Sequence, residues 1–142
     1  MTKKTTESGA APRATARKKA TRATIMTARK VARFAWEKKA EDIMIMDLRK
    51  VTDMTSFFVL CSGNSGTQVK AIADSIQEQA RKAGLEIYAV EGYDSQRWIL
   101  IDMIDIVVHV FLPDVRAYYQ LERLWGDAPV ENIGGDEARV AR

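Results

Sequence analysis

The chain has little cysteine and little histidine, and both shortages exclude kinds of chemistry. A single cysteine, Cys61, excludes an internal disulfide and fits a protein of the reducing cytoplasm. The only histidine, His109, has no histidine partner, and one imidazole with scattered acids makes a weak metal site. The sequence therefore predicts neither a disulfide scaffold nor a zinc centre.

Long apolar runs are also missing. No run approaches the roughly 20 residues that a membrane span requires. The basic start is followed by Ala/Thr-rich sequence rather than by an apolar block, so no signal peptide is expected. These absences predict a cytoplasmic protein without a membrane segment.

The charge of the chain is divided unevenly. Residues 1–30 contain nine Lys or Arg and one acid, a net charge of +8, whereas the remainder has a net charge of −5. The first 22 residues offer almost no apolar side chain to bury, so residues 1–22 are predicted to be a basic, disordered arm. Such an arm is either a solubilising extension or a contact for RNA. Residues 23–129 are predicted to form one domain, and residues 130–142 a flexible tail.

Hydrophobic periodicity predicts a single α/β domain in the order αββαβββα, with a mixed five-stranded sheet flanked by helices. Thr24 or Thr27 can cap the first helix, and Ser65 or Thr67 the second. Asp114 can cap a last helix that extends to about Trp125. The strands are expected at residues 43–48, 56–62, 86–91, 97–102 and 105–112, with a right-handed crossover around the second helix.

Residues 62–66, with the sequence SGNSG, follow a predicted strand and precede a predicted helix. A glycine-rich turn at a helix N-terminus can bind phosphate. This one lacks the lysine of a P-loop and the spacing of a dinucleotide fingerprint. A strand-to-helix turn with a capping residue is therefore the favoured interpretation.

Asp102 and Asp105 form a pair of acids that, with the Gly-Ser turn, suggests a nucleotidyltransferase. Metal-dependent phosphoryl transfer needs two carboxylates on one strand face, usually as D-x-D. The two acids are three positions apart with a chain reversal between them, so they cannot form that face. We therefore predict no catalytic residue, no metal site and no cofactor, with a nucleotidyltransferase-like enzyme acting on nucleotides as the alternative.

His109 and Cys61 are the remaining chemical candidates. Cys61 lies in another predicted strand and has no clear base nearby except His109, which argues against a nucleophile. His109 is instead expected to be a structural residue that is hydrogen-bonded to a neighbouring acid.

Aromatic side chains suggest a binding surface. Strand alternation places Trp98, Leu100 and Asp102 on one face, and helical spacing places Tyr118, Leu121 and Trp125 along one side of the last helix. Leu121 and Trp125 are expected in the core. The tip at Met103 and Ile104 is unusual, because a tight turn prefers Gly or Asn and an apolar pair there needs something to cover it.

Two long motifs resemble the bacterial ribosomal silencing factors, the Iojap-related family. Residues 98–111 read W-x-L-x-D-x-x-D-x-V-V-H-V-F, residues 116–129 read R-x-Y-Y-x-L-E-x-L-W-x-D-A-P, and residues 57–74 (FFVLCSGNSGTQVKAIAD) agree as well. The resemblance extends from about Thr27 to Pro129. Two positions depart from the family pattern: Ser56 replaces a usual acid, and Ile104 replaces a usual glycine between the two acids.

The resemblance implies a nucleotidyltransferase-like architecture without its catalytic acids, and a function by occlusion. The chain would bind the large ribosomal subunit through ribosomal protein fourteen and block joining of the small subunit, lowering translation when nutrients are scarce. Apart from the resemblance, the charge of the arm makes a contact to ribosomal RNA possible, and an unpaired apolar patch makes a homodimer of the free protein through the same surface possible. The contacting residues expected are Trp98, Asp102, Met103, Ile104, Asp105, Glu91, Gly92 and Tyr118.

Overall fold

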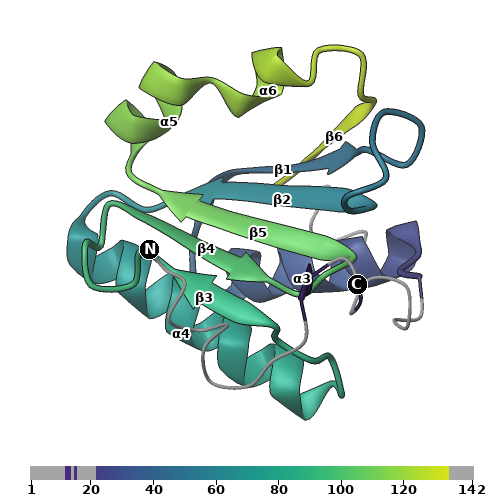
Figure 1. Ribbon diagram of the computed structural model, residues 1–142. Coiled ribbons are helices and arrows are strands. Elements are labelled where there is room, and N and C mark those ends of the chain that lie inside the picture. Colours follow the sequence, from purple (N-terminus) through teal and green to yellow (C-terminus); the bar gives the residue numbers. More distant parts are fainter. Residues whose placement is uncertain (1–11, 14, 16–21, 135–142) are drawn as a thin grey trace.

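The computed structural model describes residues 12, 13, 15 and 22–134, and these form one mixed sheet with helices on both faces (Figure 1). This confirms the predicted single α/β domain. The described elements, in chain order, are α3 (Ile25–Glu37), β1 (Glu41–Asp47), β2 (Phe57–Ser62), α4 (Gly66–Lys82), β3 (Ala89–Glu91), β4 (Trp98–Asp102), β5 (Ile106–Phe111), α5 (Pro113–Tyr119), α6 (Leu121–Leu124) and β6 (Val130–Ile133).

The sheet has six strands in the order β3-β4-β5-β2-β1-β6. The central pair, β2 and β5, is parallel, and every other neighbouring pair is antiparallel. All six residues of β5 are buried, as predicted for a strand covered on both faces. Helix α4 connects β2 to β3, and β4 and β5 lie between these two strands in the sheet, so the helix does not join adjacent strands.

The sixth strand corrects the predicted five-stranded sheet. Residues Val130–Ile133 pair with β1 and extend the domain beyond Pro129, where the sequence had predicted the start of a flexible tail. The strand is only four residues long and lies at the edge of the sheet, so its apolar alternation is too short to identify from sequence. Residues 135–142 of the predicted tail lie outside the described residues.

The two long helices begin where the sequence predicts. The Thr24 side chain accepts a hydrogen bond from the Thr27 backbone N–H, and the Ser65 side chain accepts one from Gln68 N–H. Helix α4 ends with Arg81 and Lys82 in its last turn, where positive charge suits the helix dipole.

The last helix is broken in two, contrary to the single helix predicted to Trp125. Gln120 adopts a left-handed conformation with φ 47° and separates α5 from α6. Helix α5 has no side-chain cap, so Asp114 does not cap it as predicted; Pro113 stands in its first turn instead. The break explains why helical spacing grouped the wrong residues: Tyr118 is 81% exposed, whereas Leu121 is buried.

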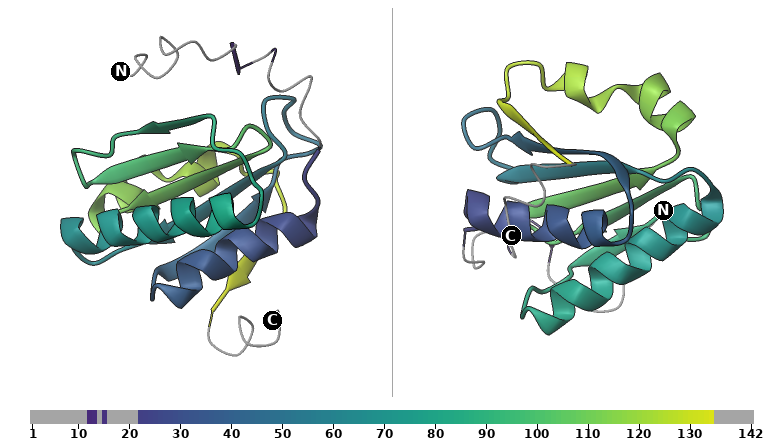
Figure 2. Two further views of the ribbon diagram at one scale, coloured as in Figure 1. Left: turned by 90° about the horizontal axis from the view of Figure 1, so that it is seen from below. Right: turned by 180° about the vertical axis from the view of Figure 1, so that it is seen from behind.

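Helices α3 and α4 pack on one face of the sheet, and α5 and α6 lie across the other (Figures 1 and 2). The first face buries a large core of mainly aliphatic side chains from both long helices and five strands. The second face buries a smaller cluster that includes Phe111 and Leu121, with Trp98 and Trp125 packed against it. The sequence predictions for Leu121 and Trp125 as core residues are therefore confirmed.

Candidate functional site

Strand β4 presents different side chains to the two faces, as alternation predicts. Ile99 and Ile101 are fully buried under the long helices, whereas Trp98 and Leu100 point to the second face and remain half-buried. The strand registers extend this second face sideways, since Glu91 of β3 pairs with Leu100, which pairs with His109 of β5.

Aromatic rings gather at the end of β4 nearest α5. The Trp98 ring lies 4.8 Å from Tyr119, 5.5 Å from Phe111 and 5.9 Å from His109 between centroids. Tyr118 and Tyr119 are 81% and 53% exposed, and their rings are 5.0 Å apart between centroids. We call the surface of Trp98, Leu100, Tyr118 and Tyr119 the aromatic face. The sequence identified Trp98 and Tyr118, but missed Tyr119 because it treated α5 and α6 as one helix.

His109 supports this face from below. Its Nδ1 accepts a hydrogen bond of 3.1 Å from Trp98 Nε1, so its partner is an indole and not the acid that the sequence predicted. The imidazole is buried, and burial lowers its pKa to about 3. Its Nε2 has no hydrogen-bond partner among the described residues, and the Phe58 ring packs edge-on at 4.6 Å between centroids. His109 is therefore a neutral residue that fixes the Trp98 ring.

Asp102 ends β4 and Asp105 precedes β5, so the two acids flank the turn between these strands, and each accepts a hydrogen bond from a backbone N–H. Asp102 Oδ1 accepts a 2.8 Å hydrogen bond from Ile104 N–H. Asp105 Oδ1 accepts a 2.8 Å hydrogen bond from the Ser56 hydroxyl, and Ala23 N–H donates to the same carboxylate. Both carboxylates are buried, so the acids that the sequence placed on the surface shape the turn itself.

Ile104 stands in this turn with φ 69°, a left-handed conformation that costs a β-branched residue energy. This accounts for the glycine that the family pattern has at the position. The Ile104 side chain is 7% exposed, so the apolar tip is covered. Burial of this side chain offsets part of the backbone strain.

The SGNSG turn is occupied by its own capping bonds. Gln68 N–H donates to Ser65 Oγ over 3.1 Å, and Asn64 N–H donates to Gln68 Oε1 over 2.6 Å. A side chain at Gly66 would approach Gln96 Oε1 to 3.0 Å and Gln96 Cβ to 3.1 Å, so the Gln96 side chain packs closely over this turn. The geometry supports the capping interpretation, because side chains of the turn and of α4 already accept hydrogen bonds from the backbone N–H groups of Asn64 and Gln68.

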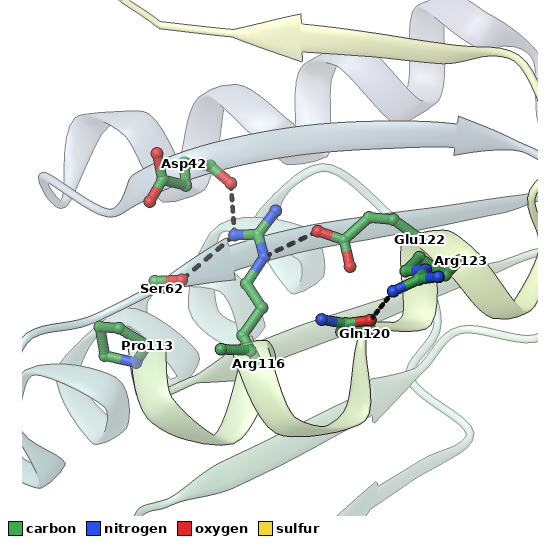
Figure 3. A pocket seen from close by; sticks show the side chains of 8 residues that line it. Asp42, Ser62, Pro113, Arg116, Gln120, Glu122 and Arg123 are labelled. Atoms are coloured by element: carbon green, nitrogen blue, oxygen red, sulfur yellow. Dashed lines mark hydrogen bonds and ion pairs between the residues drawn. The ribbon is translucent and has the colours of Figure 1, made fainter.

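A surface pocket of about 390 Å³ lies between α5 and strands β1 and β2 (Figure 3). The Arg116 guanidinium crosses it and donates to Asp42 O over 2.6 Å and to Ser62 Oγ over 3.1 Å. Its Nε donates to Glu122 Oε2 over 3.2 Å. These bonds join α5 to two strands and to α6, so Arg116 has a structural role that the sequence did not reveal.

Catalytic groups are not brought together in the described part of the chain. Burial raises the pKa of the Cys61 thiol to about 12, which makes it a poor nucleophile. No group of three or more His, Cys, Asp or Glu in residues 22–134 is arranged to hold a metal ion. None of the described helices is both long and apolar enough to cross a membrane.

These features define a single-domain α/β protein whose sheet leaves one aromatic face partly uncovered. The chain belongs to the family of ribosomal silencing factors, because the family model described as "Ribosomal silencing factor during starvation" matches residues 18–142. This confirms the resemblance found in the sequence motifs.

Individual relatives agree with this assignment. The chain is 48% identical over 99 residues to ribosomal silencing factor RsfS of Halalkalibacterium halodurans, covering 70% of this chain and 85% of that protein. It is 46% identical over 97 residues to RsfS of Bacillus subtilis, covering 68% and 82%. A crystal structure of a Chromobacterium violaceum protein superposes with a TM-score of 0.70 at 38% identity, covering 80% of this chain and 95% of that one.

Proposed function

We propose that this protein represses translation by binding ribosomal protein fourteen of the large ribosomal subunit and sterically blocking the small subunit. The mechanism is occlusion and needs neither a cofactor nor a chemical step. The protein would act in the cytoplasm, where ribosomal subunits join.

One observation carries the proposal, namely the aromatic face. Trp98 and Leu100 are half-buried on β4, and the exposed Tyr119 packs against Trp98 with the exposed Tyr118 next to it. Aromatic side chains bury a large area with little loss of rotamer freedom, and they are enriched among residues that dominate binding energy. The hydrogen bond to His109 already fixes the Trp98 ring, so this side chain loses less conformational entropy when a partner binds.

Charge favours a basic protein as the partner. Residues 31–142 have a net charge of −5, which repels RNA and attracts a Lys/Arg-rich protein surface during encounter. Glu91 and Gly92 are exposed at the edge of the aromatic face. Gly92 has φ 75°, and a side chain there would meet Trp98 O at 2.2 Å, so glycine keeps this edge close to β4.

The proposed contact set contains residues of unequal accessibility. Trp98 and Met103 are half-buried, whereas Glu91, Gly92 and Tyr118 are exposed and can touch a partner directly. Ile104 and Asp105 are buried and would contribute by shaping the turn, whereas the Asp102 side chain is 11% exposed and can also meet a charged group directly.

Two further contacts complete the proposal. The basic arm, most of which lies outside the described residues, would add salt-sensitive contacts to ribosomal RNA. The aromatic face would pair with a second copy in the free protein, because an exposed apolar patch favours self-association. Neutralising the basic residues of the arm other than Arg13 should weaken ribosome binding mainly at low salt, and an equal loss at high salt would argue against an electrostatic arm.

Sedimentation of purified ribosomal subunits tests the main proposal. Trp98→Ala should weaken binding to the large subunit about thirtyfold, because loss of a central aromatic anchor costs roughly 2 kcal/mol. Trp36→Ala is the matched control, since Trp36 is another half-buried tryptophan but lies on α3. Tyr118→Ala is a second test with little risk to folding.

Circular dichroism and thermal melting must first show that each variant is folded. If folded Trp98→Ala and Tyr118→Ala proteins both block subunit joining at wild-type concentrations, the aromatic face is not the binding site. Calorimetry with ATP, CTP and Mg²⁺ tests the enzyme alternative. It should detect no binding, and a stoichiometric heat with micromolar affinity would favour an enzyme.

A further inference from the structure

Arg13 lies far from the turn in sequence, but its guanidinium is bound there. Its Nε donates to Asp102 Oδ2 over 2.8 Å, and its Nη2 reaches Asp102 Oδ1 at 3.3 Å. Nη2 also donates to Ile104 O over 2.6 Å, and Nη1 donates to Met54 O over 2.5 Å. All three guanidinium nitrogens therefore have acceptors, which come from the β4–β5 turn and from the loop before β2.

These acceptors are held in position by bonds within the domain. Asp102 is fixed by Ile104 N–H, and the left-handed Ile104 directs its own carbonyl. The loop that carries Met54 is tied to the turn because Ser56 N–H donates to Asp105 O over 3.0 Å, in addition to the hydroxyl bond to the Asp105 carboxylate. None of these bonds involves Arg13, so the acceptors are preorganised.

The arrangement suits arginine and not lysine. A carboxylate that faces Nε and Nη2 together matches the planar fork of a guanidinium, and a compact ammonium cannot reach two carboxylate oxygens and two separate carbonyls at once. The Arg13 side chain is still 25% exposed, so solvent reaches the bound group. Because the Arg13 side chain is not enclosed, it can leave these acceptors and another arginine can take its place.

The bound arginine lies at one end of the surface proposed to bind a partner. Asp102, Leu100 and Trp98 alternate along β4 and share its second face. A basic protein seated on the aromatic face would extend toward Asp102, which Arg13 already neutralises.

We propose that Asp102, Ile104 O and Met54 O form an arginine-binding socket that Arg13 fills in the free protein, and that a partner's arginine enters by displacing Arg13. The claim that a partner's arginine enters the socket rests on the proposed function, whereas the socket itself does not. An arm tethered to the domain competes at high effective concentration, so Arg13 reduces the affinity for a basic partner.

Variants of the full-length chain test the competition. Arg13→Ala should tighten binding to purified large subunits by roughly three- to tenfold, because it removes the internal competitor. The matched control is Arg22→Ala, which removes an exposed arginine of the same charge and should not tighten binding. In the Asp102→Asn background, which keeps an acceptor for Ile104 N–H, Arg13→Ala should have no effect. Weaker binding by Arg13→Ala than by Arg22→Ala would overturn the competition.

A ribosome-free titration separates the socket from the proposed function. N-acetyl-arginine amide should shift the backbone amide resonances of Ile104 and Thr55 in the Arg13→Ala protein, and N-acetyl-lysine amide should not. The wild-type protein should show no shift at the same concentrations. No arginine-dependent shift, or equal shifts with lysine, would overturn the socket. If the Arg13→Ala protein binds N-acetyl-arginine amide but neither it nor the wild-type protein binds ribosomes, the proposed function is wrong and the arginine-binding socket is still supported.

Discussion

The two faces of the sheet are built from the same strands but differ in what they bury. The face under α3 and α4 contains mainly aliphatic side chains in one continuous core, with fully buried positions such as Ile99, Ile101 and Val108. The face beside α5 and α6 contains rings, a buried imidazole and two half-buried side chains of β4. The first face has the composition of a core whose purpose is stability, and the second combines packing with exposed surface.

The difference separates stability from binding on a single strand. Neighbouring residues of β4 point to opposite faces, so Ile101 and Leu100 are adjacent in sequence but experience different surroundings. Substitutions at the two positions can therefore distinguish a residue that holds the fold from one that meets a partner.

The largest effect is expected for Ile101→Ala, which empties part of the first face. Loss of a fully buried isoleucine side chain should reduce the free energy of unfolding by about 3 kcal/mol. Leu100→Ala should reduce it by only about 1 kcal/mol, since Leu100 is half-buried, while weakening ribosome binding about tenfold. Urea denaturation and subunit sedimentation measure the two quantities. Equal stability losses would mean that the two faces are not functionally distinct.

The next effect concerns pH and the second face. Burial lowers the pKa of His109 from its ordinary value of 6.5 to about 3, so the folded protein keeps this imidazole neutral. Below pH 6.5 the unfolded chain binds the proton and the folded chain does not, so stability is complete above this pH and falls as the pH decreases toward 3. At pH 5 the loss should be about 2 kcal/mol relative to pH 8.

Urea denaturation between pH 8 and pH 5 measures this dependence. His109→Gln keeps an acceptor for Trp98 Nε1 but cannot titrate, so its stability should change less over this range. If the wild-type and His109→Gln proteins lose the same free energy between pH 8 and pH 5, another group is responsible.

A smaller effect is expected at the turn that ends the second face. Within a helix or strand, a glycine normally makes a protein less stable than an alanine does, by roughly 0.5–1 kcal/mol. At Ile104 the left-handed φ of 69° should reverse this order, so Ile104→Gly should be more stable than Ile104→Ala by about 1 kcal/mol. Both variants lose the buried side chain, so their difference isolates the backbone. Thermal melting of the two variants at equal concentration measures this difference. A higher melting temperature for Ile104→Ala than for Ile104→Gly would show that the backbone at this position is not strained.

The smallest effect is expected for an ion pair at the edge of the sheet. Arg29 on α3 contacts Glu131 on β6 at 2.9 Å, and their side chains are 38% and 36% exposed. Glu131→Ala should cost about 0.5 kcal/mol at low ionic strength and nearly nothing in 1 M salt, because solvent and ions screen the pair. A loss that persists at high salt would indicate that Glu131 packs β6 against β1 through more than its charge.

Much of the fold was predictable because it depends on local pattern. Alternating apolar residues identified five strands, and the capping roles of Thr24 and Ser65 were visible before their helices. The sixth strand, β6, was missed because four residues carry too little pattern. The break at Gln120 was missed because nothing in its local sequence requires a left-handed residue there.

The candidate site was predictable in part. Alternation correctly assigned Trp98 to the face opposite Ile99, and the aromatic character of the surface was evident. The partner of His109 was predicted wrongly, because the register of β4 against β5 decides that Trp98 reaches the imidazole. Arg13 was predicted to lie in a disordered arm, and its contact with Asp102 joins residues 89 positions apart.

The sequence by itself determined the α/β class, the order of most elements, the family and the two-sided character of β4. These follow from residue spacing along the chain, which acts over a few positions. Only the tertiary structure decided which polar groups meet: His109 with Trp98, Asp105 with Ser56, and Arg13 with Asp102. Hydrogen bonds need partners within about 3 Å, and strand register and turn geometry bring distant residues within that range.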